Sequence, residues 1–482
     1  MYIYKVFIKV IQNRIASKLD SHQPPEQAGF RPGFSTTDHL HSLNQIIEKY
    51  NEYNKDLYLA FVDFSKAFDS LHHNSIITAL TNQNIEPVYI QILEKIYNNS
   101  TADIKLQQTG ATFKIEKGVK QGDPLSPKLF TATLEEIFKG LAVLWTDRGI
   151  DIGGRRLTNL RFADDIVLFA TSAPTLQTML EDLSTASLEV GLTMNRSKTK
   201  VMSNSAKRRV EVDGQEIQYV EEYLYLGQIA SFHNRQDKEI ERRIENAWKS
   251  FWSMKSLMKG ELPLSLKRKL LDSCILPVLT YGAQTWSLTE HQKSRLKVCQ
   301  RAMERSILGV TRLDRVRNTT LRFATRIKDV GAQTAKLKWA WAGHVMRMHP
   351  DRWAKIITEW VPSDGRRRPA RFSISPELQV VNIDVIDSVS CDRLLIRYCN
   401  RNFCGVQEHQ VCGGVLAGGI DSCQGDSGGP FQAELPLPGG TGGHMHHVFG
   451  VTSFGVGCAE PNTPAVYTRV SAFVDWIESI VW

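Results

Sequence analysis

Hydrophobic positions in the first 230 residues of the chain follow two different periods. In MYIYKVFIKVIQNRIASKL, apolar residues recur at helical spacing, and basic residues interrupt them too often for a signal peptide. This segment is therefore predicted to be an amphipathic helix. In DLYLAFVDF, apolar residues alternate so that Leu57, Leu59, Phe61 and Asp63 share one side, which predicts a buried strand.

The same spacing rules predict further elements along the chain. Helices are expected at about 36–53, from about 75, from Pro87, after Pro127 and at about 174–190. A hairpin is expected between 102 and 127, and LRFADDIVLFA has the pattern of a second, tight hairpin. From Asp237 to about Leu308 the pattern is helical, basic and aromatic. The mixture predicts an α+β domain up to about residue 230 with a helical domain behind it.

From Ser375 onward the pattern changes to short apolar runs separated by glycine-rich turns. LQVVNIDVI, HVFGVTSFG and AVYTRV are predicted strands, and SAFVDWIESIV is a predicted closing helix. This is the profile of a small β-barrel. At 482 residues the chain is longer than one hydrophobic core usually serves, so several domains are expected.

Charge and cysteine usage support a break near residue 370. The net charge is +8; residues 373–482 hold four Arg, no Lys and eleven Asp or Glu, giving −7, which leaves +15 for residues 1–372. The basic part indicates a polyanionic partner such as nucleic acid, although ordinary surface charge explains it equally well. Six of the eight cysteines lie in the last 110 residues, which indicates an oxidising compartment for that part. No apolar run approaches the roughly 20 residues of a membrane span.

Two adjacent carboxylates, Asp164 and Asp165, stand between apolar runs in FADDIVLF. Exposed loop acids are the ordinary explanation of such a pair, but here the flanks predict a turn held between buried strands. Asp63 ends another apolar strand. Burying carboxylates is costly unless cations neutralise them, and hard cations prefer carboxylate oxygens. Three acids on neighbouring strand ends are therefore candidate ligands for two Mg²⁺ ions.

Five segments occur in the order of the palm motifs of reverse transcriptases: LAFVDFSKAFD, GVKQGDPLSPKLF, RFADDIVLF, GLTMNRSKTKVM and YLYLG. With EQAGFRPGFSTTDHL before them and WAGHVMRM and DGRRRP after them, residues 1–370 resemble the polymerase of non-LTR (LINE-type) retrotransposons. The resemblance implies a right-hand polymerase with fingers and palm at 1–232, a helical thumb at 233–345 and a basic linker at 346–375. It also implies RNA-directed DNA synthesis from an RNA template, a DNA primer and deoxynucleoside triphosphates.

The resemblance assigns roles to individual residues. Asp63 and Asp164 correspond to metal-binding aspartates, Asp165 to their partner, and Phe68 to an aromatic residue that excludes a ribose 2′-hydroxyl. A core phenylalanine is the alternative for Phe68. The remaining candidates are Gln121, Gly122 and Arg31 for the nucleotide, Lys198 or Lys200 as general acid toward pyrophosphate, and Tyr225, Leu226 and Gly227 for the primer end.

The segment after residue 376 contains DSCQGDSGGP and resembles the second barrel of a trypsin-like serine protease. The resemblance makes Ser427 the nucleophile, with Gly425 and Ser427 amides as oxyanion hole. It places Asp421 in the specificity pocket, Asp426 opposite a cut N-terminus, and Ser453 and Gly455 on the substrate-binding strand. The disulfide pairs that it implies are Cys391–Cys412 and Cys423–Cys458, with Cys399–Cys404 as a third.

Departures from both families limit what is expected. The chain starts inside the family's finger sequence, and no endonuclease domain is seen. The base and acid of the protease come from a first barrel that is not seen either, and His444, His446 and His447 are predicted to be exposed loop residues. The expected function is thus RNA-directed DNA polymerase, with a serine endopeptidase or a non-catalytic chimeric relic as alternatives. The polymerase would work in the nucleus or cytoplasm, whereas the tail would be secreted.

Overall fold

The computed structural model describes residues 2–105, 109–362, 380–399, 403–419, 421–422, 426–436, 444–455 and 460–481. The chain separates into two compact units, Met1–Arg367 and Arg368–Trp482, which are described one after the other.

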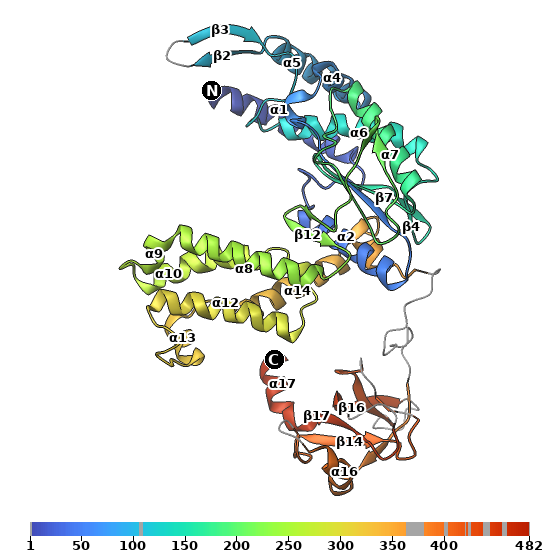
Figure 1. Cartoon of the computed structure of the whole chain (residues 1–482), viewed down its shortest axis with the longest axis vertical. Coiled ribbons are helices and arrows are strands. Elements are labelled where there is room, and N and C mark those ends of the chain that lie inside the picture. The colour runs from blue at the N-terminus through green and yellow to red at the C-terminus, as the bar shows by residue number, and fades with distance from the viewer. Residues whose placement is uncertain are drawn as a thin grey trace. The chain divides into compact units, whose positions relative to one another are not determined.

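The first unit is built on a four-stranded antiparallel sheet in the order β6-β7-β1-β8. In β1, Tyr58–Val62, Ala60 faces Leu168 of β7 on one side and Val201 of β8 on the other. Every residue of β1 is buried, so the strand is covered on both sheet faces. The predicted strand and the predicted hairpin are both confirmed, and together they form the centre of the fold (Figure 1).

Different helices cover the two faces of this sheet. Alternate side chains of β1 point into two apolar clusters: Ala60 and Val62 pack with Phe130 and Leu176 of helices α6 and α7. Leu59 and its neighbours on the opposite face pack with helix α2 and with helix α15, which comes from the far end of the unit. The α+β class is therefore correct, with the helices α6 and α7 on one side and α2 and α15 on the other.

The helices and strands of residues 2–231 have the following bounds. The helices are α1 Tyr2–Ser21, α2 Thr36–Glu52, α3 Ala67–Ser70, α4 His73–Asn82, α5 Pro87–Asn98, α6 Ser126–Leu144 and α7 Ala173–Glu189. The strands are β1 Tyr58–Val62, β2 Thr101–Lys105, β3 Thr109–Lys114, β4 Ile150–Ile152, β5 Arg155–Leu157, β6 Asn159–Phe162, β7 Asp165–Ala170, β8 Lys200–Ser203, β9 Glu211–Val212, β10 Gln215–Glu216, β11 Glu222–Tyr225 and β12 Gln228–Ser231.

Helix α1 confirms the predicted N-terminal helix, but only part of its expected apolar face is buried. Ile11 and Ile15 are 3% and 0% exposed, whereas Ile3 and Val10 are 86% and 51% exposed. The first turns of α1 thus extend beyond the described core. The Pro- and Gly-rich segment between α1 and α2 forms a loop, as its composition predicts, and Ser35 caps α2 with a capping box to Asp38.

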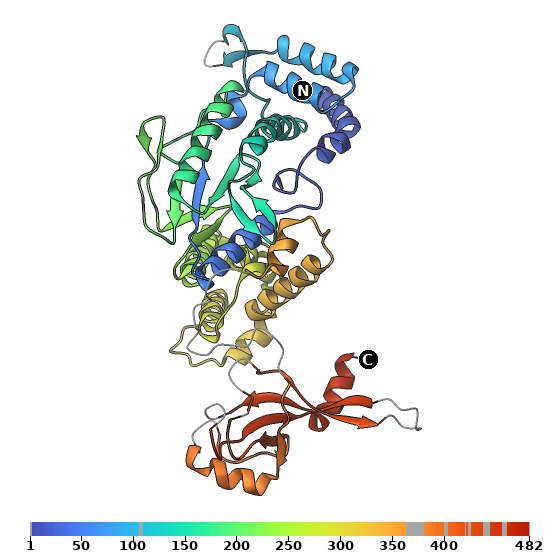
Figure 2. The same ribbon diagram turned by 90° about the vertical axis from the view of Figure 1, so that its right-hand side faces the viewer.

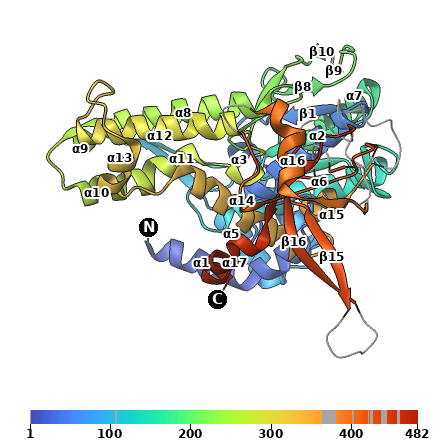
Figure 3. The same ribbon diagram turned by 90° about the horizontal axis from the view of Figure 1, so that it is seen from below.

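A helical domain follows the sheet and confirms the prediction for the basic, aromatic segment. Its helices are α8 Arg235–Ser253, α9 Lys255–Lys259, α10 Leu264–Leu270, α11 Leu276–Leu279, α12 Glu290–Leu308, α13 Asn318–Thr325 and α14 Val330–Met346. Helices α8 and α12 pack side by side around a core that includes Phe251, Trp286 and Met303 (Figure 3).

The segment predicted as a basic linker contains a helix within its described residues. Helix α15, Trp353–Glu359, packs on α2 and contributes Trp353 and Ile357 to the apolar cluster beneath the sheet. Lys49 of α2 donates to the carbonyl oxygen of Ile357 at 2.6 Å. Residues 353–360 therefore belong to the polymerase-like unit, and the unit boundary lies at Arg367.

The second unit contains a five-stranded antiparallel sheet in the order β13-β14-β17-β16-β15 (Figure 2). Its elements are β13 Asp384–Ile386, α16 Ser388–Leu395, β14 Gln410–Gly414, β15 Pro430–Pro436, β16 His444–Phe454, β17 Ala465–Arg469 and α17 Val474–Val481. The predicted strand over 378–386 is limited to its last three residues, and 378–379 lie outside the described residues. The all-β character with a closing helix is confirmed.

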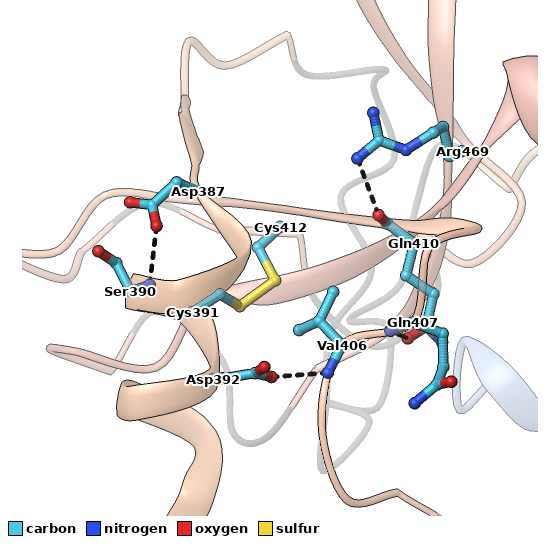
Figure 4. Close-up of a disulfide and its surroundings, with 9 residues drawn as sticks. All are labelled: Asp387, Ser390, Cys391, Asp392, Val406, Gln407, Gln410, Cys412 and Arg469. Carbon is cyan, nitrogen blue, oxygen red and sulfur yellow. Dashed lines mark hydrogen bonds between the residues drawn. A yellow bond between two sulfur atoms is a disulfide. The ribbon is translucent and has the colours of Figure 1, made fainter.

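Disulfides hold the start of this second unit together. Cys391 of α16 is bonded to Cys412 of β14, and the amide of Val406 donates a hydrogen bond to Asp392 Oδ1 at 2.6 Å beside this disulfide (Figure 4). Cys399 is bonded to Cys404. Both predicted pairs are confirmed, whereas Cys423 and Cys458 lie outside the described residues. In the parts of the chain that the structure describes, no helix combines the length and apolar character needed to cross a membrane.

Candidate active site

The antiparallel register brings the predicted carboxylates to one end of the sheet. Val62, the last residue of β1, faces Ile166, so Asp63 follows directly beside the start of β7. Phe162 pairs with Asp165, which leaves Ala163 and Asp164 as a two-residue turn between β6 and β7. Asp63 and Asp164, which are 101 positions apart in the sequence, are thereby neighbours.

Burial and mutual repulsion perturb these carboxylates. Burial first, and then the negative charges of Asp164 and Asp63, raise the pKa of Asp165 from an ordinary value of 3.8 to about 6. The pKa of Asp164 is also raised, first by burial and then by the charge of Asp63, against an opposing backbone hydrogen bond. A raised carboxyl pKa means that the charged form lacks compensating cations in this arrangement.

Asp63 also lacks close groups that would compensate its negative charge. Asp63 Oδ2 is buried without a hydrogen-bond partner among the described residues, and Lys198 Nζ lies 4.0 Å from it. Among the described residues, Lys198 is the cation that pairs with Asp63, and the side chain of Lys198 is 68% exposed. Buried polar atoms without partners are uncommon and require an explanation, such as an ion that binds there.

The donor set fits a hard divalent cation, although it does not enclose one by itself. Among the described residues, no group of three His, Cys, Asp or Glu side chains is gathered so that it could hold a metal ion. Magnesium usually takes only one or two carboxylates and fills its other positions with water and substrate phosphates. The cluster therefore fits an ion that is shared with a nucleotide better than an ion held by protein alone.

The register also separates the two candidate lysines. Lys200 begins β8 opposite Phe61, and its ammonium group donates to Ser197 O and Gln218 Oε1, each at 2.7 Å. Lys198 lies in the preceding turn and approaches Asp63. The structure therefore places Lys198, and not Lys200, beside the carboxylates.

Phe68 occupies a partly buried position on helix α3. Its ring stacks on Phe130 with a centroid distance of 4.5 Å and meets the edge of Phe30 at 6.3 Å. Its carbonyl oxygen accepts a hydrogen bond from the amide of Val119 at 2.7 Å. Phe68 is thus fixed on one side by core contacts, as the alternative of a core phenylalanine predicts. The side chain is only partly buried, so the rest of its surface is accessible.

Gln121 contacts Asp69, the residue that follows Phe68 in the chain. Its side-chain amide donates to Asp69 Oδ1 at 2.9 Å, and both residues line a cavity of about 670 Å³. Gly122 follows in a turn with a φ of +78°, a left-handed conformation that suits glycine. The three carboxylates are not among the residues that line this cavity.

Arg31 makes contacts with the backbone around its own loop. Its guanidinium donates to the carbonyl oxygens of Pro24 and Gln27 at 2.6 and 2.9 Å, and it lies 4.2 Å from the ring centroid of Phe34. Burial lowers the pKa of Arg31. These contacts tie the loop before α2 together, and the donors of Arg31 are engaged within that loop.

The turn expected at the primer end joins the sheet domain to the helical domain. Tyr225 is 2% exposed and its hydroxyl group faces the interior, so its side chain supports the turn from below. Leu226 O accepts from Tyr281 at 2.8 Å, and Gly227 O accepts from Arg242 and Arg243 of α8. The exposed part of this turn is therefore Leu226–Gly227.

Sequence reasoning missed one aromatic residue beside the carboxylates. Tyr223 stacks on Phe61 at 4.2 Å, and its pKa is raised by burial and by the charges of Asp165 and Asp63. Alternation along β11 was the available signal, because Tyr223 and Tyr225 are two positions apart and share a strand face.

The protease-like loop is described only in part. Gly425 lies outside the described residues, whereas Ser427 is exposed in a turn held by the amide of Gly428, which donates to Thr452 O at 2.9 Å. Asp421 Oδ1 accepts from the amide of Ser422 at 2.7 Å, and Asp426 O accepts from the amide of Gly429. Ser453 lies on β16, and Gly455 follows that strand.

The prediction that His444, His446 and His447 are loop residues is wrong. They form the start of β16 and pair with β15, where His446 faces Glu434. The predicted strand HVFGVTSFG begins at His447, and the structure extends it back to His444. His444 and His446 are polar and exposed, so no apolar period predicts this extension. His446 Nε2 lies 3.7 Å from Glu434 Oε1, and within the described residues no hydrogen bond joins a histidine to Ser427.

Comparison with known proteins agrees with this geometry. Residues 1–230 match the family model described as reverse transcriptase (RNA-dependent DNA polymerase). A transposon-derived protein of Caenorhabditis elegans is 34% identical over 247 residues, which is 48% of this chain and 88% of that protein. The N-terminal part of the chain belongs to the reverse transcriptase family. The Pol polyprotein of the type-1 retrotransposable element R2 of Bradysia coprophila is 29% identical over 201 residues, 42% of this chain and 23% of that protein.

The C-terminal part of the chain matches a second family model. Residues 358–477 match the trypsin model. The serine protease snk of Drosophila melanogaster is 44% identical over 108 residues, or 22% of this chain and 24% of that protein. The chain thus contains a reverse transcriptase domain, and its last quarter is similar to trypsin-like proteases. It spans at most about a quarter of the length of the curated R2 and protease relatives that it matches. Family membership supports dependence on a divalent metal and substrates of nucleic acid and nucleotide for the first domain.

Proposed function

We propose that the reverse transcriptase domain synthesises DNA on an RNA template by two-metal nucleotidyl transfer. The observation that carries this proposal is the charge cluster at the end of the sheet. The pKa values of Asp164 and Asp165 are raised, in part by the charge of Asp63, and Asp63 Oδ2 has no hydrogen-bond partner among the described residues. Lys198 is the described cation that approaches Asp63. Cations that neutralise such a cluster would stabilise it at neutral pH.

Asp63 and Asp164 are proposed to hold two Mg²⁺ ions together with the phosphates of the incoming nucleotide, and Asp165 adds negative charge beside them. When bound, such ions activate a 3′-hydroxyl and stabilise a pyrophosphate leaving group. In the reaction, the primer 3′-hydroxyl loses its proton to water and its oxygen forms a bond to the α-phosphorus, while the bond from that phosphorus to the bridging oxygen breaks and pyrophosphate leaves. Lys198 supplies a proton to the departing pyrophosphate.

Other residues are proposed to orient the substrates. Phe68 stands where its open surface would meet the sugar and excludes a 2′-hydroxyl, while Gln121 and Gly122 border the nucleotide. The Leu226–Gly227 turn supports the primer end, since its carbonyl oxygens are fixed by Tyr281 and by α8. The basic helices behind it bind template and primer phosphates without reading sequence.

Primer extension tests the proposal. The full chain with Mg²⁺, deoxynucleotides and a DNA primer on an RNA template is expected to give extended products. Asp63→Asn and Asp164→Asn should abolish extension, because losing one ligand disables the metal pair. Extension that both variants retain would refute the site, and no extension by the wild type would support a non-catalytic relic instead.

We also propose that the trypsin-like domain does not cleave peptides. A serine hydroxyl needs a base to remove its proton, and the histidines nearest in sequence lie on β16 in contact with β15. The test is labelling of the full chain with a fluorophosphonate probe and hydrolysis of an arginine ester. Labelling or turnover that is lost in Ser427→Ala would contradict the proposal.

A further inference from the structure

The side chain of Gln27 reaches from the loop between α1 and α2 to the turn that carries Asp164. Gln27 Oε1 accepts a hydrogen bond from the amide of Ala163 at 3.1 Å and a second one from the amide of Gly29 at 2.8 Å. Gln27 is fully buried, with 0% of its surface exposed. One oxygen atom thus connects two segments that are 136 positions apart in the sequence.

Backbone contacts bring the same two segments together. The amide of Ala28 donates to Arg161 O at 2.9 Å, and the amide of Arg161 donates to Glu26 O at 2.8 Å. These bonds form a short parallel bridge between the loop and β6. Arg161 is itself fixed by a buried ion pair with Glu135 of α6, at 2.9 Å. The loop is therefore registered against the strand that leads into the catalytic turn.

Gly29 shows how close this contact is. A Cβ atom at position 29 would lie 2.3 Å from the backbone nitrogen of Ala163, which no side chain tolerates without a shift of the backbone. The turn needs such support because Ala163 has a φ of +58°, in the left-handed region that non-glycine residues seldom adopt. Residues in this region persist only where surrounding structure holds them.

The hydrogen bonding of the two ends of the Gln27 amide distinguishes a positioning role from a purely structural role. Two amide donors face the same side-chain atom, so that atom must be the oxygen. The other end, Nε2, is buried without a partner among the described residues. A buried amide nitrogen without a hydrogen-bond partner is unfavourable, so an apolar side chain at position 27 would make the core more stable. The feature that an apolar side chain would lose is the acceptor for Ala163.

We propose that Gln27 is a positioning residue that holds the Ala163–Asp164 turn in its productive shape. The proposal rests on the polymerase function proposed above. Gln27 acts through the turn and has no contact with the substrates, so its loss should lower kcat for nucleotide addition and leave KM for nucleotide and primer nearly unchanged.

The test compares Gln27→Met with Gln83→Met in the full chain. Methionine keeps the volume of glutamine and removes the acceptor. Gln83 is also 0% exposed and donates to Ala132 O at 2.9 Å, but it contacts α6 and not the turn, so it is a matched control for the loss of a buried amide. Gln27→Asn, which retracts the amide by one methylene, is the milder variant if methionine prevents folding.

Two readouts are needed. Hydrogen exchange of peptides that contain residues 159–168 should become faster in Gln27→Met and stay at the wild-type rate in Gln83→Met. In single-nucleotide addition, kcat of Gln27→Met should fall on the order of tenfold to a hundredfold, as expected for a small misplacement of a catalytic group.

Unchanged exchange in the turn, or faster exchange with unchanged kcat, would overturn the positioning role. An inactive wild type would refute the polymerase function instead, and the exchange experiment would still decide whether Gln27 holds the turn.

Discussion

Replacing Asp165 with asparagine should stabilise the metal-free protein, although it damages the candidate active site. Burial and the charges of Asp164 and Asp63 raise the pKa of Asp165 to about 6 from 3.8. The folded state therefore holds a proton that the unfolded chain has already released between these pH values. Stability falls as the pH rises through this window, and above the folded-state pKa the full penalty remains.

The size of the effect follows from the shift. A rise of about two pKa units corresponds to about 3 kcal/mol if nothing screens it. Asp165 is partly exposed, so solvent screening reduces this value, and a gain of about 1 kcal/mol is expected for Asp165→Asn at neutral pH. For a domain of this size, that gain raises the melting temperature by about 2 °C.

The assay is calorimetry of the full chain, with EDTA and with Mg²⁺, at about pH 7.5 and about pH 5. With EDTA, Asp165→Asn should melt higher than wild type at the upper pH, and the difference should shrink at the lower pH. Mg²⁺ should raise the melting temperature of the wild type more than that of the variant. Asp147→Asn, an exposed aspartate after α6, serves as control and should change neither value. A lower melting temperature for Asp165→Asn with EDTA, or an equal change at both pH values, would refute the claim that these carboxylates repel one another.

Three further predictions follow from single contacts. Lys198→Ala should slow nucleotide addition, whereas Lys200→Ala should not, because Lys200 is engaged by Ser197 and Gln218; equal rates in rapid-quench assays would contradict this. Phe68→Val should raise the use of ribonucleotides relative to deoxynucleotides, by up to roughly a hundredfold if the clash is about 3 kcal/mol, and an unchanged ratio in an active enzyme would return Phe68 to the core. Arg352→Ala should destabilise the first unit by about 2 kcal/mol, because Arg352 pairs with the buried Asp38 and donates to Gly33 O; denaturant unfolding with Arg156→Ala as exposed control would show it, and equal midpoints would contradict it.

Local pattern was enough to place the carboxylates. The apolar alternation before Asp63 and the two apolar runs around Asp164 predict strands that end in acids, and the antiparallel register confirms that arrangement. Helices α1, α2, α4, α5, α6 and α7 were predictable for the same reason, since apolar spacing and terminal residues are encoded within each segment. The cysteine pairs Cys391–Cys412 and Cys399–Cys404 came from family resemblance, not from spacing.

Contacts between distant segments were not predictable from pattern. Nothing in EQAGF indicates that Gln27 bonds to Ala163, because the contact depends on how the loop is folded back onto β6. Helix α15 lies within a basic stretch, and only the packed structure shows that Ile357 enters the core beneath the sheet. Arg31 was assigned to the nucleotide by resemblance, whereas the carbonyl oxygens of Pro24 and Gln27 engage it here. Such contacts depend on tertiary packing, which overrides local preference.

Counting bound metal ions tests the central claim most directly. Mn²⁺, which replaces Mg²⁺ at oxygen-rich sites, gives an electron paramagnetic resonance signal that is lost on binding, so free and bound ions can be titrated. With an RNA template, a dideoxy-terminated primer and the next nucleotide, the wild-type chain is expected to bind two ions that Asp63→Asn and Asp164→Asn bind weakly or not at all. Asp147→Asn should match the wild type. If the two active-site variants bind the same ions as tightly as the wild type, Asp63 and Asp164 are not the metal ligands, and the proposed polymerase mechanism is wrong.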